Sequence, residues 1–139
     1  MFNKVENTMQ PQQLRIARPV TSVSKSCAMY CHGLGLKKVA EFIDHAGFNG
    51  CMVGMDGISW HLEFTQCQFH PIKPSPTPDD LLVLYFPDKD SWHLICQRMD
   101  DAGFSRVKSF NPYWESKGVT FEDDDGYRVV IQNMHWESL

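Results

Sequence analysis

Several features that would place this chain of 139 residues in other classes of protein are missing. No apolar run approaches the roughly 20 residues that cross a bilayer, and the polar start contains no apolar signal-peptide segment. There is no basic cluster, and the net charge is −4, so the chain does not resemble proteins that bind nucleic-acid phosphates. We therefore expect a cytoplasmic protein with no membrane or nucleic-acid partner.

Paired cysteine motifs are missing as well. The five cysteines are an odd number without a Cys-x-x-Cys pair, which favours free thiols in a reducing compartment. Cys27 and Cys31 lie four residues apart, next to His32, on one expected helix face. Because no third or fourth ligand is evident nearby, packing in a helix core is favoured over a soft-metal site.

What the chain does contain is one order of elements used twice. Hydrophobic residues make up 42%, enough for an ordinary globular core. Residues 1–13 and 134–139 are expected to be terminal tails, and residues 69–80, with four prolines, an extended linker. Residues 14–68 and 81–133 each predict a strand, a helix and three strands. The predicted fold class is therefore α+β, with two βαβββ modules in one structural domain.

Turn and cap residues support these elements. Residues 22–35 predict a helix that begins at Ser22 or Ser24 and ends at glycine, and residues 88–103 predict the second helix. Asp56-Gly57 joins two strands as a hairpin. Residues 123–125, Asp-Asp-Asp, are interpreted as a solvated turn, since their spacing is not that of a calcium loop.

Two motifs resemble the vicinal oxygen chelate superfamily of glyoxalases, bleomycin- and fosfomycin-resistance proteins and extradiol dioxygenases. KSCAMYCHGLGLKKV is similar to the family's first helix, and VTFEDDDGYRVVIQN to its closing hairpin. In that hairpin Asp124 replaces the usual proline and Tyr127 the usual asparagine. The resemblance covers about residues 14–133 and is greatest to uncharacterised, glyoxalase-like bacterial members. It implies curled mixed sheets around a cleft, helices outside, and a homodimer.

The resemblance also implies where a divalent metal would be held, on one residue of each of four strands. The first position falls on Arg15, which does not coordinate metals, and the second on Glu63, which matches. The third falls on Leu81, or on Val83 if the register differs by two, and the fourth on Val130. One carboxylate does not make a metal site, so we expect no metal and no other cofactor.

The same positions predict the lining of the cleft. Arg15 and Glu63 are expected to face each other as an ion pair. Strand alternation adds His61 beside Glu63 and Arg128 beside Val130. Trp114, in the NPYWESKG loop, is expected to close one mouth of the cleft, or else to plug the end of the barrel. The predicted ligand-binding residues are Arg15, His61, Glu63, Leu81, Val83, Trp114, Arg128 and Val130.

Three functions remain open from the sequence. The first is a metal-free protein that binds a small anionic or aromatic molecule in the cleft, with Arg15–Glu63 either part of the site or only a structural pair. The second is a lyase or isomerase that uses His61 and Glu63, or a metalloenzyme with displaced ligands. The third is a structural or regulatory module whose cleft is filled by side chains.

Overall fold

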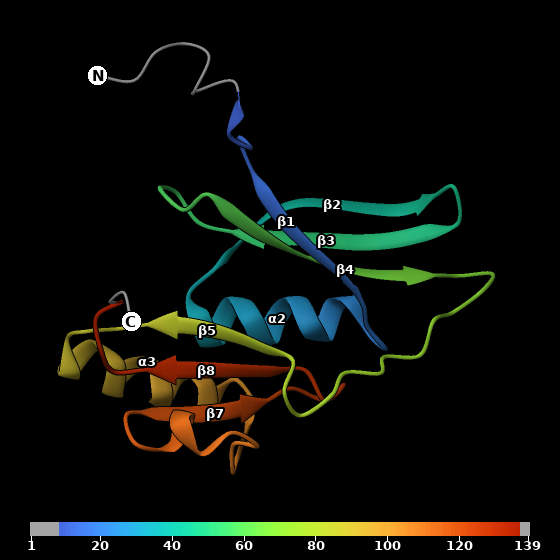
Figure 1. The fold of residues 1–139 in the computed structure, drawn as a ribbon. Helices are drawn as coiled ribbons and strands as arrows, with labels where there is room; N and C mark the ends of the chain where they lie inside the picture. Colours follow the sequence, from blue (N-terminus) through green and yellow to red (C-terminus); the bar gives the residue numbers. More distant parts are fainter. Residues whose placement is uncertain (1–8, 137–139) are drawn as a thin grey trace.

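The computed structural model describes residues 9–136, and it confirms the predicted fold class of two βαβββ modules (Figure 1). The first module contains β1 (Leu14–Pro19), α2 (Val23–Leu34), β2 (Lys37–His45), β3 (Phe48–Gly54) and β4 (Trp60–Cys67). The second contains β5 (Leu81–Tyr85), α3 (Lys89–Asp101), β6 (Ser105–Val107), the short 3₁₀ helix η1 (Pro112–Glu115), β7 (Gly118–Glu122) and β8 (Arg128–Gln132).

The segments between and beyond the modules form no regular elements where they are described. The linker, residues 69–80, has no helix or strand, as its prolines predict. Residues 10–13 and 134–136 are also irregular, while the remainder of the expected tails, residues 1–8 and 137–139, lies outside the described residues. Within residues 9–136, neither helix combines the length and apolarity needed to cross a membrane.

Both helices begin at polar caps that the sequence supplies. The Ser22 hydroxyl accepts a hydrogen bond from the Lys25 backbone N–H at 3.2 Å, and Gly35 ends α2 with a φ of 72°. That angle lies in the left-handed region, where glycine carries no steric cost. Asp88 accepts from the Ser91 backbone N–H at 2.9 Å and begins α3 in the same way.

Each module has one four-stranded sheet with the same strand order. The orders are β1-β4-β3-β2 and β5-β8-β7-β6, in which the first pair is parallel and the others antiparallel. Side chains alternate between the two faces of a strand, so Leu62 and Phe64 of β4 pack under α2, whereas His61 and Glu63 lie on the opposite face. We call these the helix-covered face and the helix-free face of each sheet.

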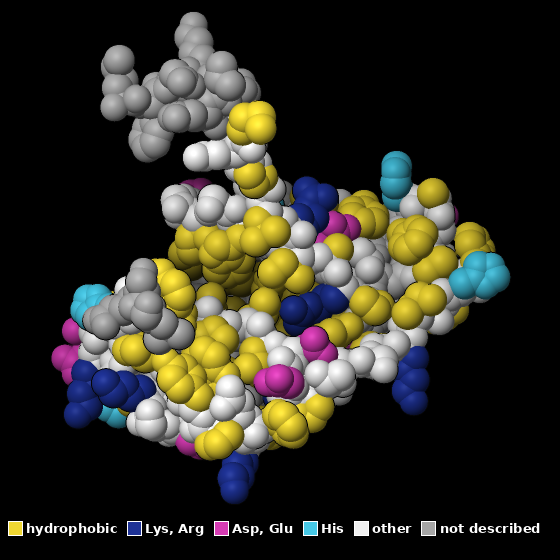
Figure 2. Space-filling model, in the orientation of Figure 1, with side chains coloured by type: hydrophobic (Ala, Val, Ile, Leu, Met, Phe, Trp, Pro, Cys, Tyr) yellow, Lys and Arg dark blue, Asp and Glu magenta, His cyan; other side chains and the backbone are white. Residues whose placement is uncertain are grey.

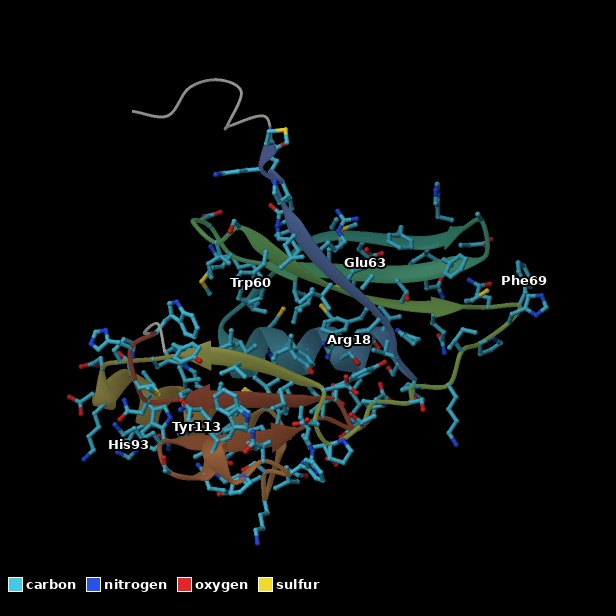
Figure 3. All side chains as sticks on the ribbon, in the orientation of Figure 1. Arg18, Trp60, Glu63, Phe69, His93 and Tyr113 are labelled. Carbon is cyan, nitrogen blue, oxygen red and sulfur yellow. The ribbon has the colours of Figure 1, made fainter. Side chains whose placement is uncertain are left out.

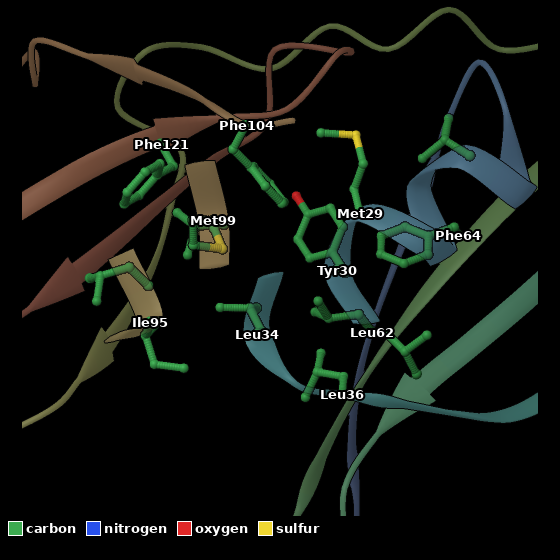
Figure 4. Packing of buried hydrophobic residues seen from close by; sticks show 14 of the residues in the cluster. Met29, Tyr30, Leu34, Leu36, Leu62, Phe64, Ile95, Met99, Phe104 and Phe121 are labelled. Atoms are coloured by element: carbon green, nitrogen blue, oxygen red, sulfur yellow. The ribbon is translucent and has the colours of Figure 1, made fainter. Parts of the chain in front are cut away.

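The helix-covered faces of both modules share one hydrophobic core. Tyr30 of α2 lies between Phe64 and Phe104, with ring centroids 4.9 and 5.1 Å away, and Met99 of α3 packs against α2 (Figure 4). The two helices pack against each other, with α2 beneath the first sheet and α3 behind β5 and β8 in Figure 1. As a result, the two helix-free faces belong to separate sheets and point away from the shared core.

The acidic turn of residues 123–125 contacts the first module, and its interpretation as a solvated turn was wrong for Asp123, while Asp124 is exposed. Asp123 is only 8% exposed, and its carboxylate accepts a hydrogen bond from the Tyr30 hydroxyl at 2.7 Å. Asp124 pairs with Lys25, and Asp125 accepts from the Thr21 backbone N–H at 3.1 Å. Only the tertiary structure places α2 over this turn, 93 residues further along the chain.

Asp123 is expected to make stability fall as the pH rises. Burial raises the pKa of the Asp123 carboxyl above 3.8, although bonds from Tyr30 and two backbone N–H groups favour the carboxylate. A raised folded-state pKa means that the folded state binds the proton more tightly than the unfolded state does. Its contribution is therefore complete below pH 3.8 and lost as the pH rises through the folded-state value.

Urea unfolding between pH 3.5 and about 7 measures this effect. The quantity to follow is the free energy of unfolding of the parent minus that of Asp123→Asn. That difference should fall with rising pH. Asp80→Asn is a control of opposite sign, since hydrogen bonds from Thr77 lower the pKa of the Asp80 carboxyl. A parent-minus-Asp123→Asn difference that is flat or rises with pH would contradict the assignment.

Candidate functional site

The helix-free face of the first module carries the predicted ion pair. Register pairs Arg15 of β1 with His61 of β4, two residues before Glu63. One guanidinium nitrogen of Arg15 lies 3.4 Å from a carboxylate oxygen of Glu63. The Arg15 side chain is 48% exposed and that of Glu63 only 12%. The pair is thus half-buried, with the carboxylate the more buried partner and the guanidinium the more exposed one.

His61 lies on the same face, and a glycine makes room for it. A Cβ at Gly54 of β3 would lie 2.5 Å from the ring carbon Cδ2 of His61, closer than real contacts allow. Gly54 therefore lets the imidazole lie directly on the sheet. The His61 Nδ1 atom is buried and has no hydrogen-bond partner among the described residues. A buried polar atom of this kind is uncommon in native proteins.

Four predicted residues of the second module lie together on its helix-free face. Register pairs Leu81 with Arg128 and Val83 with Val130, and these four alternate with Leu82, Leu84, Val129 and Ile131, which pack on the core. Val130 is fully buried. Arg128 donates to the Glu122 carboxylate at 2.9 Å and reaches the backbone oxygens of Pro78 and Lys108 at 3.5 Å. Its guanidinium is thus committed within the module.

The chain does not unite the predicted lining residues in one cleft. Arg15, His61 and Glu63 lie on one sheet, and Leu81, Val83, Arg128 and Val130 lie on the other. Where the modules meet, Leu81 borders a hollow of about 460 Å³ together with Arg18, which lies on the opposite face of β1 from Arg15. Figure 3 shows Arg18 beside α2 and Glu63 within the first sheet. The structure therefore brings Leu81 next to Arg18.

Arg18 is a charged residue that the sequence argument did not single out. Its guanidinium carbon lies 4.4 Å from the centroid of the Tyr127 ring, and its Nη1 atom is buried without a hydrogen-bond partner among residues 9–136. A cation over an aromatic face is favourable, which accounts for part of its burial. Strand alternation from Ile16 predicts that Arg18 faces the core.

Two further polar residues on the second helix-free face were missed. Thr120 of β7 is 3% exposed and Gln132 of β8 is 1% exposed, and neither Thr120 Oγ1 nor Gln132 Oε1 has a partner among the described residues. Gly118 makes room for this amide, since a Cβ there would lie 2.4 Å from Gln132 Oε1. Alternation from Val130 points to Gln132 two residues later, so the signal was present in the strand pattern.

Trp114 lies in η1, which packs against β7 of its own module. Asn111 caps η1 by accepting from the Tyr113 backbone N–H at 3.0 Å, and the Tyr113 and Trp114 rings meet edge-on at 4.8 Å. The Trp114 backbone carbonyl lies beside Gly118, at the edge of the helix-free face. A contact between the indole and a ligand stays a prediction.

The divalent metal that the superfamily resemblance implies does not fit the residues present. Glu63 is the one ligand-type side chain at the four expected positions, and its carboxylate pairs with the Arg15 cation. Among residues 9–136, no group of three or more His, Cys, Asp or Glu side chains is arranged to hold an ion. A stable site for such metals needs several nitrogen or oxygen donors, which this face does not offer.

Comparison with known proteins identifies the family. The YycE-like N-terminal domain family matches residues 14–65, and the YycE-like C-terminal domain family matches residues 79–133. The uncharacterized protein YycE of Bacillus subtilis (strain 168) is 41% identical over 127 residues, which cover 91% of each chain. A crystal structure of YycE from Bacillus subtilis has a TM-score of 0.84, with 91% of this chain and 93% of that chain covered.

More distant solved structures share the fold alone. Glyoxalase I of Leishmania major has a TM-score of 0.67 at 14% identity, covering 90% of this chain and 88% of that chain. TnmS3, an antibiotic binding protein from Streptomyces sp. CB03234, has a TM-score of 0.62 at 19% identity, and the match covers 88% of this chain and 95% of that chain. The two family matches and the 41% identity establish that this chain belongs to the YycE-like family, whose fold the glyoxalase-like structures share.

Proposed function

We propose that the protein binds a small molecule, without a metal, on its helix-free faces. The observation that carries this proposal is the position of three of the four buried polar atoms that lack partners among the described residues: His61 Nδ1, Thr120 Oγ1 and Gln132 Oε1, the fourth being Arg18 Nη1 on the core side of β1. All three lie on helix-free faces. Leaving such an atom unpaired costs about 1–3 kcal/mol. A ligand with polar groups relieves that cost, whereas a cleft filled by apolar side chains does not.

The surrounding residues favour an anionic or aromatic ligand. The half-exposed Arg15 guanidinium offers donors for an anionic group, because its pairing with Glu63 at 3.4 Å is long and leaves other nitrogens available. Leu81 and Val83, beside the buried Val130, provide an apolar wall on the other sheet. A mostly apolar surface with a few polar groups is typical of small-molecule sites. The antibiotic-binding protein TnmS3 shares this fold, which is consistent with such a role.

A complete site on this fold requires two copies of the chain. The two helix-free faces of one chain point away from the shared core, so we infer that the first-module face of one copy meets the second-module face of another. In a two-fold dimer this contact occurs twice, with Arg15 opposite the partner's apolar wall. Figure 2 shows hydrophobic side chains gathered over both sheets on one face of the molecule, which supports an interface there.

A lyase or isomerase reaction is the second candidate function. It is favoured by His61, which has one buried unpartnered nitrogen and lies on the same face as the Glu63 carboxylate. A histidine and a carboxylate on one face are suited to moving a proton. Product formation from a bound compound, lost in both His61→Ala and Glu63→Gln, would distinguish this reaction from binding alone.

The proposal is tested by a thermal-shift screen of small anionic and aromatic compounds together with Mn²⁺, Ni²⁺ and Zn²⁺. We expect at least one organic compound to raise the melting temperature and to bind roughly tenfold or more weakly in Arg15→Ala, because a lost charged hydrogen bond is worth about 1.5–3 kcal/mol. Arg106→Ala is the matched control, since it removes an exposed ion pair with Asp100 outside the site and should leave the affinity unchanged. Light scattering should give a dimer.

Two results would overturn the proposed function. One is about one metal ion per chain by elemental analysis, with that ion lost in Glu63→Gln. The other is a compound whose affinity is the same in the parent and in variants of Arg15, His61 and Gln132. A monomer with unchanged ligand affinity would reject the shared site and leave the binding role standing.

A further inference from the structure

A cluster of three thiols lies on the other side of the first sheet, next to α2. A hollow of about 640 Å³ opens between α2, β2 and β3, and it is bordered by Cys27 and Cys31 of α2 and by Cys51 of β3. The sequence places Cys27 and Cys31 on one helix face, but only the fold adds Cys51. The cluster is separate from the helix-free faces, so it does not depend on the proposed function.

The geometry selects one pair among the three thiols. The Sγ atoms of Cys27 and Cys51 lie 2.8 Å apart, within about 1 Å of the roughly 2.05 Å length of a disulfide bond. Cys27 and Cys31 are four residues apart in a helix, so their Cβ atoms are about 5–6 Å apart. A disulfide needs about 3.5–4.5 Å, which Cys27 and Cys31 reach only if the helix distorts.

We propose that Cys27 and Cys51 form a reversible disulfide when the protein meets a low-molecular-weight disulfide, and that the hollow gives this oxidant access. Cys27 is half-buried at the hollow and meets the oxidant first. Cys51 is 1% exposed and closes the bond from inside. Cytosolic disulfides of this transient kind are typically redox sensors or catalytic groups.

The reaction proceeds in two exchange steps. The Cys27 thiolate attacks one sulfur of the oxidant R–S–S–R, which forms Cys27–S–S–R and releases one R–S⁻. The Cys51 thiolate then attacks the Cys27 sulfur, which forms the Cys27–Cys51 bond and releases the second R–S⁻. The two thiols lose two electrons and two protons in total, and the oxidant becomes two R–SH molecules.

The protonation of the cluster favours a thiol pair over a metal site. Burial raises the pKa of the Cys51 thiol to about 12 and that of the Cys31 thiol to about 11, and the nearby Lys38 ammonium offsets only part of this. Thiols with such pKa values are protonated at neutral pH, whereas metal ions require thiolates. Protonation of Cys51 also slows the second exchange step, in which its thiolate attacks Cys27.

The new bond would fasten α2 to β3. Cys27 and Cys51 are 24 positions apart in the chain, and closing a loop of this length removes conformational freedom from the unfolded chain. We therefore expect oxidation to raise the melting temperature by roughly 5–10 °C. The change acts on the first module, whose α2 also carries the contacts to the second module.

The test treats the reduced full-length protein with glutathione disulfide, then blocks the remaining thiols with an alkylating reagent and maps peptides by mass spectrometry. The chain has five free cysteines, and we expect three to remain free, with a peptide joining Cys27 to Cys51. Dithiothreitol should restore all five. Cys31→Ala should still form the bond, because Cys31 is not part of the pair. Cys51→Ala should instead retain glutathione on Cys27.

Cys96 provides the matched control. It is 3% exposed, and burial raises the pKa of its thiol to about 11, but it lies in α3 of the second module. Cys96→Ala should form the Cys27–Cys51 bond as the parent does. Five free thiols after sustained exposure, or a bond between any other two cysteines, would overturn the proposal. Since the mapping uses the parent protein, a variant that fails to fold does not weaken the test.

Discussion

Replacement of Tyr30 by alanine is expected to lower the free energy of unfolding by roughly 3–5 kcal/mol, which is typical of deleting a buried aromatic ring. Tyr30 is fully buried, and its ring packs between Phe64 and Phe104 at centroid distances of 4.9 and 5.1 Å. Its hydroxyl also donates to the buried Asp123 carboxylate at 2.7 Å. The variant therefore loses the core contacts of both modules and leaves a buried carboxylate without one of its donors.

Two other variants separate these contributions. Tyr30→Phe keeps the ring and removes only the hydroxyl, so it should cost about 1–3 kcal/mol, the usual cost of an unsatisfied buried group. Tyr113→Ala removes a tyrosine ring that is 52% exposed and should cost under about 0.5 kcal/mol. Urea unfolding of all three measures the differences. A Tyr30→Ala variant within about 1 kcal/mol of the parent would show that the modules are not joined through this ring.

Replacement of Met99 by alanine is expected to lower the free energy of unfolding by about 2–5 kcal/mol. A second substitution, Gly33→Ala on the facing helix α2, should recover part of this loss. Met99 is fully buried, and its sulfur lies 2.7 Å from the position of a Cβ at Gly33 of α2. In the parent, Gly33→Ala gains about 0.5–1 kcal/mol of helix propensity but crowds this sulfur. Once Met99 is shortened, the closest clash is removed and only Phe104 Cε2, 3.1 Å from the Cβ position, must move slightly, so part of the gain remains.

A double-mutant cycle measures this coupling. The combined variant Gly33→Ala/Met99→Ala should be more stable than the sum of the single variants predicts, by about 1 kcal/mol or more. Gly33→Ala combined with Ile95→Ala is the control, because Ile95 is buried in α3 but is not among the atoms that crowd Gly33. If the effects of Gly33→Ala and Met99→Ala on the free energy of unfolding add within about 0.3–0.5 kcal/mol, the helices do not meet at Gly33 as described.

The helices and hairpins were predictable because their signals are local. Ser22 and Gly35 bound α2, and Asp56-Gly57 turns between β3 and β4, because caps and turns depend on residues that are neighbours in the chain. The Arg15–Glu63 pair was also predicted, since strand alternation and the superfamily resemblance both place these residues on one face. The structure puts their charged atoms 3.4 Å apart.

The acidic turn shows where local signals stop. Asp-Asp-Asp is a polar turn by every local criterion, yet Asp123 is buried because α2, from the other module, packs over it. The thiol cluster has the same cause, since Cys51 reaches Cys27 only when β3 packs under α2. In both cases the partner lies far away in the chain, and residue spacing carries no information about it.

The sequence by itself predicted the two βαβββ modules and the faces of the strand residues, because both follow from periodicity and turns, while two motifs carried the superfamily resemblance. The tertiary structure alone decided how the modules meet. Packing of α2 against α3 buries apolar surface from both modules in one core, and this leaves the two helix-free faces on separate sheets. Arg15 therefore lies on the helix-free face of one sheet and the buried Val130 on that of the other, although the sequence placed them in one cleft.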